Sequence, residues 1–403
     1  MMPVVFRIPY LELDIPGFGL MLMLGFLISI LWAARRAARS GANPDVVLNC
    51  GFVALLAGVV GARAMFVLHY WEQFAGRGSA WNVFWAIVDV RMGGLEFYGG
   101  FLLSVVLVVA WIRWYEKVSL RWYLDIIAPS AALGLAFGRV GCLLNGCCYG
   151  TTCELPWAVR FPVGSPAAVE QWEKNVPGAA LPEQLVYVAP AGNARPVLRE
   201  SLSASDGQIE RARENEAKLR HALADAQAVA DKETDPSRKR TLERRAERAR
   251  ADVRAARAKF EDVRALSDKY ATTPAALRAL ARNYGSAPVH PTQVYSTITA
   301  LLIALALNAL YWRRTRDGQV ICTLLLIEPA SRWVIELIRA DNPIDTLGAF
   351  TISQGLAMAM TLVGLLGLFA LPALPPRSPR ARIWVPEDEQ GGTSPTPKSA
   401  PVA

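Results

Sequence analysis

Seven long apolar stretches alternate with polar segments along the 403 residues of the chain. Each stretch is long enough to cross about 30 Å of hydrocarbon as a helix. Because lipid offers no hydrogen bonds to the backbone, a spanning segment must satisfy its own polar groups, which favours helices. The pattern therefore predicts an all-α integral membrane protein, a seven-span helical bundle with an extramembrane head. The stretches run over about 17–34, 46–70, 94–112, 124–144, 294–312, 320–338 and 350–371.

One long polar insertion, residues 165–285, separates the fourth stretch from the fifth. It holds two segments in which the seam positions alternate spacings of four and three, the pattern of a coiled coil. Thr234, Asp235 and Pro236 stand between them, and proline disfavours helical continuation. We expect an antiparallel helical hairpin, serving either as a solvated packing arm or as a docking site for a partner or substrate. The seam residues are Ile209, Ala212, Glu216, Leu219, Leu223 and Ala226, then Leu242, Ala246, Ala249, Val253, Ala256, Phe260 and Val263.

Basic residues concentrate in short loops on one side of the predicted bundle, at 33–41, 113–121, 313–316 and from 377 onward. The positive-inside rule places these loops in the cytoplasm. The N-terminus and the insertion then lie on the outer side of the membrane, and the C-terminus lies in the cytoplasm. The predicted domains are a first membrane part (1–164), the insertion (165–285), a second membrane part (286–372) and a disordered tail (373–403).

Composition agrees with a chain that combines apolar spans with a charged insertion. Of the residues, 53% are hydrophobic, and the net charge is nevertheless +8. The positive charge lies beside apolar runs, so we expect membrane lipid and no nucleic acid as a partner. The basic cluster Arg35, Arg36 and Arg39 follows the first apolar run, which favours a retained first span over a cleavable signal.

Charged residues interrupt several predicted spans, where each costs about 2.5–3.5 kcal/mol on insertion scales. Glu328, Arg332, Glu336 and Arg339 are spaced by four, four and three, so they share one helical face. They form either an ion-paired stripe that locks helices together or a polar cavity, open to the outer leaflet, for an anionic lipid head group. Arginine suits the second role because its planar fork matches phosphate oxygens. The other two intramembrane arginines are Arg63 and Arg139.

Two glycine-rich segments, 93–100 and 138–150, stand at span ends, and glycine permits close backbone approach. The second segment and Cys153 give four cysteines within twelve residues, the others being Cys142, Cys147 and Cys148. Disulfides are the first expectation on an oxidising face, followed by free buried thiols and a catalytic thiol. Zinc is not expected from the spacing, because no CxxC pair or histidine cluster accompanies them.

A third motif, residues 290–295, opens the fifth span. Its histidine, His290, is a candidate base or hydrogen-bond donor. Cys50 and Cys322 stand inside apolar spans and are expected to fill space.

These segments together resemble the bacterial phosphatidylglycerol–prolipoprotein diacylglyceryl transferases, over about residues 15–162 and 286–372. The family is a seven-span inner-membrane enzyme with a periplasmic head. The residues that carry the resemblance are Gly19–Leu22 with Arg35 and Arg36, Gly61–Arg63, Gly93–Gly100, Gly138–Gly150, Pro156–Pro162, His290–Tyr295, and Arg332, Glu336 and Arg339.

The chain also departs from the family at five positions. The family usually has histidine where this chain has Tyr98, asparagine at Cys142, an acidic residue at Cys147, tyrosine at Glu328 and commonly tyrosine at Phe18. The hairpin insertion has no counterpart in its compact members. The resemblance thus keeps the lipid-binding half of the site and alters the half that manages protons.

The resemblance implies transfer of a diacylglyceryl group from phosphatidylglycerol to a cysteine thiol near a prolipoprotein signal peptide, without a cofactor. It implies Arg139 and Arg332 as phosphate ligands, with Arg339 positioning the head group and Glu336 holding an arginine. The expected base is His290, with Tyr98 or Glu328 as alternatives. The remaining implied substrate-binding residues are Asn145, Gly150 and Arg63.

Three other readings stay open at this point. One is a non-catalytic lipid-binding scaffold that displays the hairpin, and another is a related transferase with a different acceptor. The third is a transporter, which the absence of an obvious internal repeat or of a pair of broken spans disfavours.

Overall fold

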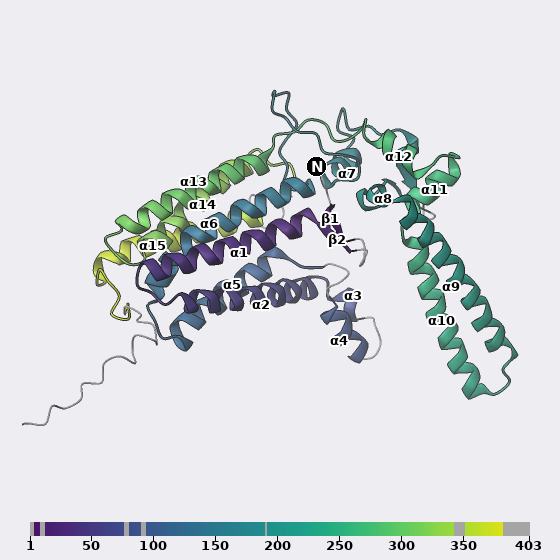
Figure 1. The fold of residues 1–403 in the computed structure, drawn as a ribbon, viewed down its shortest axis with the longest axis horizontal. Coiled ribbons are helices and arrows are strands. Elements are labelled where there is room, and N and C mark those ends of the chain that lie inside the picture. The colour runs from purple at the N-terminus through teal and green to yellow at the C-terminus, as the bar shows by residue number, and fades with distance from the viewer. Residues whose placement is uncertain are drawn as a thin grey trace, which may run out of the picture. The chain divides into compact units, whose positions relative to one another are not determined.

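The computed structural model describes residues 4–8, 13–75, 80–89, 94–189, 192–341 and 351–381, and these are mostly helical (Figure 1). The chain divides into two compact units. The first comprises Met1–Met21, Arg139–Tyr295 and Ile335–Pro343, and the second comprises Leu22–Gly138, Ser296–Val334 and Ile344–Ala403. The predicted tail lies mainly beyond residue 381, outside the described residues.

Among the described residues, 6 helices are long and apolar enough to cross a membrane, and each matches a predicted stretch. These are α1 (Gly17–Arg39), α2 (Pro44–His69), α5 (Phe97–Ala110) with its π-helical continuation η1 (Trp111–Tyr115), α6 (Leu120–Asn145), α13 (Thr292–Arg313) and α15 (Ile352–Ala370), which η3 (Leu371–Ala373) follows.

The remaining predicted span forms helix α14 (Gln319–Glu336). It is 18 residues long and contains Pro329 besides Glu328, Arg332 and Glu336. These charges separate it from the six helices that meet the length and composition of a span. The structure therefore supports a multi-pass helical membrane protein.

Backbone contact between α2 and α5 explains one glycine-rich segment of the sequence. The two helices run side by side (Figure 1). A Cβ atom on Gly61 would lie 2.5 Å from the carbonyl oxygen of Gly99, and one on Gly100 would lie 2.6 Å from that of Gly58. Only glycine permits this approach, as in small-residue helix interfaces of membranes.

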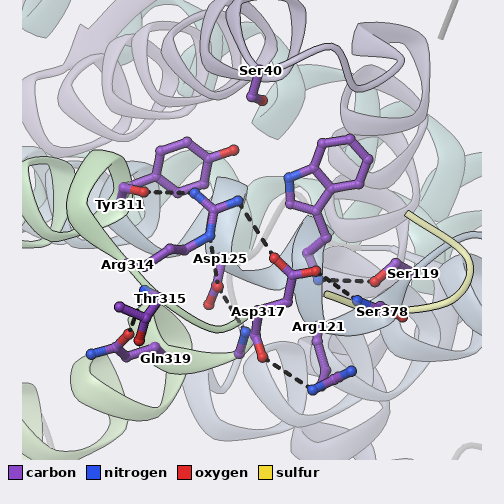
Figure 2. A network of polar contacts seen from close by, with 12 residues as sticks. Ser40, Ser119, Arg121, Asp125, Tyr311, Arg314, Thr315, Asp317, Gln319 and Ser378 are labelled. Carbon is purple, nitrogen blue, oxygen red and sulfur yellow. Dashed lines mark hydrogen bonds and ion pairs between the residues drawn. The ribbon is translucent and has the colours of Figure 1, made fainter. Parts of the chain in front are cut away.

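Apolar side chains from α1, α2, α6, α13 and α14 form the main core of the second unit. At one edge of this core, α14 begins on a buried polar network that Figure 2 shows. The carboxylate of Asp125, 0% exposed, accepts hydrogen bonds from the amides of Gly318 (2.7 Å) and Ile321 (2.9 Å). It thereby satisfies amide groups that a helix N-terminus leaves without partners. Arg314 joins Asp125 to Asp317, whose carboxylate accepts the amide of Ser378 at 2.9 Å.

Short elements complete the described chain. Strands β1 (Val4–Ile8) and β2 (Leu13–Pro16) pair antiparallel, as do β3 (Val186–Val188) and β4 (Ala194–Pro196). The short helices are α3 (Glu72–Ala75), α4 (Ala80–Val88), α7 (Pro166–Glu173), η2 (Glu183–Leu185), α8 (Arg199–Ser203), α11 (Glu261–Lys269) and α12 (Pro274–Ala281).

Two long helices, α9 (Asp206–Lys232) and α10 (Pro236–Ala258), lie side by side within the insertion (Figure 1). Seam positions such as Ile209, Ala212 and Ala246 are buried, whereas most positions between them are exposed. The expected seam ran on to Val263, and this end was wrong. Phe260 adopts a left-handed conformation (φ 56°) between α10 and α11, so Val263 belongs to a different helix, although it still shares an apolar cluster with Ile209 of α9.

Candidate active site

The C-terminal end of α6 gathers several of the predicted site residues. Arg139 is half-buried in its last turns, and the helix ends at Asn145. The amides of Gly146 and Cys147 both donate to the carbonyl of Cys142, at 2.8 and 3.2 Å. Gly146 (φ 80°) and Cys148 (φ 59°) are left-handed, so the chain reverses directly after the helix.

This reversal brings three cysteines together. The sulfur atoms of Cys142, Cys147 and Cys148 all lie within 4.8 Å of one another. All six cysteines of the chain are free thiols, so the expected disulfides are not present, and Cys50 and Cys322 are buried as expected. Hydrogen bonds from the other two thiols lower the pKa of the Cys148 thiol, and the charges of Arg339 and Arg139 lower it further against the effect of burial.

Arg339 lies between two carboxylates next to this turn. Its side chain is 9% exposed and pairs with Glu336 at 3.3 Å and with Asp341 at 3.0 Å. Asp341 also accepts the amide of Cys148 at 2.6 Å, so one carboxylate joins the arginine to the cysteine turn. Burial raises the pKa of the Asp341 carboxyl, while Arg339 favours its charged form. Sequence reasoning missed Asp341, whose position two residues after a candidate arginine was the available signal.

Gly150 and His290 belong to an extended segment pair beside the same turn. The amide of Gly150 donates to the carbonyl of His290 at 3.0 Å, and Gly150 forms a bridge with Arg339. A Cβ atom on Gly150 would lie 2.6 Å from that of His290 and 2.9 Å from the carbonyl oxygen of Ile338. Gly150 therefore contributes through close packing of three chain segments.

His290 is half-buried, with Nδ1 3.5 Å from the hydroxyl of Tyr295. That hydroxyl accepts a hydrogen bond from the indole of Trp157 at 2.8 Å. Two other residues of the motif hold the cysteine turn, because the side chains of Thr292 and Gln293 donate to the carbonyls of Cys148 (2.6 Å) and Cys147 (2.8 Å). The predicted motif 290–295 thus supports the turn as well as offering an imidazole.

The insertion contributes directly to this region through Arg199 of α8. Arg199 is buried, with 6% of its surface exposed. Its guanidinium donates to the carbonyls of Asn145 (2.9 Å) and Leu144 (3.0 Å). These are terminal carbonyls of α6, which carry the negative end of the helix dipole. Burial lowers the pKa of Arg199. Nothing in the sequence pattern had singled out this residue.

Arg63, in the second unit, directs its guanidinium N–H groups to backbone carbonyls. It donates to the carbonyls of Ile87 (2.7 Å), Ala86 (2.8 Å), Asp89 (2.8 Å) and Gly94 (3.0 Å). Ala86 and Ile87 lie in the last turn of α4, and Asp89 and Gly94 lie beyond its end. The geometry fits a positioning residue for this loop.

The other second-unit candidates lie on α5 and α14. Tyr98 is half-buried in the first turn of α5, with its ring centroid 5.8 Å from that of Phe97. Glu328 and Arg332 are half-buried on α14. Arg332 donates from Nε to the hydroxyl of Ser353 at 2.6 Å, and Ser353 is 2% exposed. Sequence reasoning missed Ser353, which has no distinguishing pattern around it.

The structure thus brings together the candidates of the first unit, namely Arg139, Asn145, Gly150, His290, Glu336 and Arg339. A sequence profile described as prolipoprotein diacylglyceryl transferase matches residues 3–370. The chain belongs to this family.

Individual relatives agree with the family match. Proteins named phosphatidylglycerol–prolipoprotein diacylglyceryl transferase are 38% identical over 156 residues in Rhodopirellula baltica and 32% over 168 residues in Pseudoalteromonas translucida. A third, from Photobacterium profundum, is 35% identical over 156 residues. The matches cover 38%, 41% and 38% of this chain, and 31%, 60% and 56% of the respective relatives. The chain therefore spans less than two thirds of these relatives' length.

The match over residues 3–370 confirms the resemblance to the prolipoprotein diacylglyceryl transferase family. Arg139, Gly150 and Arg339, which the resemblance implies as site residues, lie around one turn. The cysteines at two of the departing positions, Cys142 and Cys147, stand in that same turn with Cys148.

Proposed function

We propose that this protein transfers the diacylglyceryl group of phosphatidylglycerol to the thiol of the lipobox cysteine of prolipoproteins. In this reaction the acceptor sulfur bonds to the glycerol carbon, the bond from that carbon to the phosphate oxygen breaks, and glycerol phosphate leaves. The thiol proton must go to a base, and the phosphate must be held while its negative charge grows.

The observation that carries the proposal is the retention of Arg139 and Arg339 beside the cysteine turn in a chain of this family. Both are permanent cations with partly or largely buried side chains, and burying a charge is costly unless it has a partner. Arg339 is already paired with Glu336 and Asp341, which suits a positioning role. Arg139 is the proposed phosphate ligand, because a fixed cation in a low-dielectric site stabilises growing charge strongly.

His290 is the proposed base, since an imidazole nitrogen can accept the thiol proton and this half-buried residue lies beside Gly150. Tyr98 and Glu328 remain alternative proton carriers, and Arg332 remains a predicted phosphate ligand. Asn145 is proposed to support the site as the last residue of α6, where its carbonyl accepts the hydrogen bond of Arg199. For Arg63, the four carbonyl contacts favour support of the loop over contact with lipid.

We place the protein in the bacterial inner membrane with seven spans, of which α14 is the sixth in chain order. The basic loops support a cytoplasmic C-terminus and a periplasmic insertion. The Glu328 and Arg332 side chains of α14 would then need protein or water around them. The seam of α9 and α10 supports an antiparallel coiled coil as the projecting part of the insertion.

The test uses the full chain in detergent with phosphatidylglycerol and a synthetic lipobox peptide, followed by mass spectrometry. We expect one diacylglyceryl group on the peptide cysteine. Arg139→Ala should abolish the product, whereas Arg254→Ala, an exposed arginine on α10, should leave it unchanged. A folded protein that binds the lipid without forming product would instead favour a non-catalytic scaffold, and transfer to a different thiol would favour another acceptor.

A further inference from the structure

The three-thiol turn after α6 has the composition of a metal site. Cys142 lies in the last turn of α6, three residues before the helix ends at Asn145. Gly146 and Cys148 are left-handed, and this turn brings Cys147 and Cys148 back towards Cys142. The three sulfurs lie within 4.8 Å of one another. In a tetrahedral zinc site with bonds of about 2.3 Å, the sulfurs stand about 3.8 Å apart. The observed grouping needs little movement to reach that spacing.

The turn is held by contacts that do not use the thiols. Gln293 and Thr292 donate to the carbonyls of Cys147 and Cys148, at 2.8 and 2.6 Å. Asp341 accepts the amide of Cys148 at 2.6 Å. Because the backbone of both residues is fixed from neighbouring segments, the sulfurs are placed before any ligand arrives. Such outer contacts are what orient the ligands of protein metal sites.

The charges around the turn suit an anionic metal–thiolate group. Three thiolates around a monovalent or divalent ion carry a net negative charge, which is costly in a half-buried place. Arg139 and Arg339 both act electrostatically on the Cys148 sulfur. Because Arg339 is already paired with Glu336 and Asp341, Arg139 is the cation that would balance that negative charge.

A disulfide is the alternative use of these thiols, and it accounts for less of the geometry. One disulfide joins two sulfurs and leaves the third unused, whereas all three converge here. Cys153, only five residues further on, is not part of the group. Thiolates select soft ions such as Cu⁺ and Zn²⁺.

From this arrangement we propose that Cys142, Cys147 and Cys148 bind one thiophilic metal ion, Zn²⁺ or Cu⁺, at the end of α6. Each thiol releases its proton on binding and forms one sulfur–metal bond, and no electron is transferred. Asp341 is a positioning residue for the site through the Cys148 amide. The sequence spacing had given no reason to expect this, because the helix end and two left-handed residues create the cluster.

The test measures metal binding by the full-length protein in detergent, reduced and then freed of reductant, independently of transferase activity. Zn²⁺ and Cu⁺ are titrated separately against chromophoric chelators, and bound metal is counted by elemental analysis. We expect one ion per chain for at least one of the two metals, with three thiols protected from a maleimide until a chelator is added.

Variants then locate the site. Cys142→Ser, Cys147→Ser and Cys148→Ser should each remove tight binding, while Cys153→Ser keeps it. Asp341→Asn should weaken affinity by about 10–100-fold, as the loss of an outer-shell contact does. Where a variant folds poorly, maleimide protection by metal in the wild-type protein decides the matter alone.

Either of two results overturns the proposal. One is equal affinity in the wild-type protein and all three serine variants. The other is thiol protection that a reductant reverses and a chelator does not, with an intact mass two hydrogens lower, which identifies a disulfide. Neither result bears on diacylglyceryl transfer, so the two proposals fail separately.

Discussion

Arg199 donates a 2.9 Å hydrogen bond to the backbone carbonyl of Asn145, 54 residues earlier in the chain. A residue of the insertion thus caps the helix that carries Arg139. Because Arg199 also reaches the carbonyl of Leu144, its fork satisfies two groups that the helix leaves without partners.

Replacement of this cap is expected to destabilise the end of α6. Hydrogen bonds to a charged group contribute about 1.5–3 kcal/mol, so Arg199→Ala should lower the free energy of unfolding by about that amount. Arg199→Lys should recover part of it, because lysine lacks the fork. Thermal unfolding in detergent measures both. Arg282→Ala, an exposed arginine after α12, is the control, and an equal loss there would contradict the capping role.

Gly150→Ala should disturb the packing around His290. The added methyl group would meet the His290 Cβ at 2.6 Å and the Ile338 carbonyl oxygen at 2.9 Å, neither of which moves easily. Overpacking of this kind costs about 1–3 kcal/mol. We expect a lower unfolding temperature and reduced transferase activity. Gly207→Ala has no atom within 4 Å of the new methyl group and should be neutral or slightly stabilising.

Arg63→Ala separates two possible roles of this arginine. If its guanidinium serves the carbonyls of Ala86, Ile87, Asp89 and Gly94, the variant loses thermal stability while the KM for phosphatidylglycerol stays within about twofold. A KM that rises about tenfold or more, with unchanged stability, would restore the role in lipid binding that the sequence suggested.

Asp125→Ala should weaken the start of α14. The substitution leaves Arg314, whose side chain is 15% exposed, without one of its carboxylates and two amides without their acceptor. Removing one partner of a buried ion pair costs about 3–5 kcal/mol. Asp125→Asn should cost less, because one acceptor oxygen remains. Ser378→Ala is the matched control for this network, since Ser378 takes part through its backbone amide (Figure 2). Unfolding curves that rank the three variants otherwise would argue against the cap.

The insertion should lose stability in acid through Glu216. Burial opposes its charged form, but the hydrogen bond and charge of Arg264, with the charge of Arg220, outweigh burial and lower the Glu216 pKa. A lowered folded-state pKa gives stability that is present above about pH 4.3, the unfolded value, and is lost as the pH falls through the folded value. Hydrogen exchange of α9 and α10 across this range should show the loss. Glu216→Gln should flatten the pH dependence, and the exposed Glu210→Gln should leave it unchanged.

The regular parts of the fold were predictable because they depend on local pattern. Apolar length gave α1, α2, α5, α6, α13 and α15, and the heptad spacing gave α9 and α10. The exception, Phe260, shows the limit of a pattern that ignores backbone angles: its apolar side chain continues the seam while its left-handed conformation ends the helix.

The site was predictable in its residues more than in its contacts. Arg139, His290 and Arg339 stand out because charged or titratable groups are costly in a membrane. Asp341 and Arg199 do not, since each acts on the backbone of a segment far away in the sequence. The convergence of the cysteines likewise depends on the turn at Gly146 and Cys148, which spacing alone does not reveal.

The contact of Gly61 with Gly99 has a mechanical consequence. With no side chain between their backbones, α2 and α5 lie so close that sliding one past the other would bring backbone atoms into collision. Arg63, on α2, donates to the carbonyl of Gly94 shortly before α5, which ties the segment that leads into α5 to the same helix pair. Tyr98 directly precedes Gly99 in the chain, so the backbone that carries this candidate residue is held by both helices.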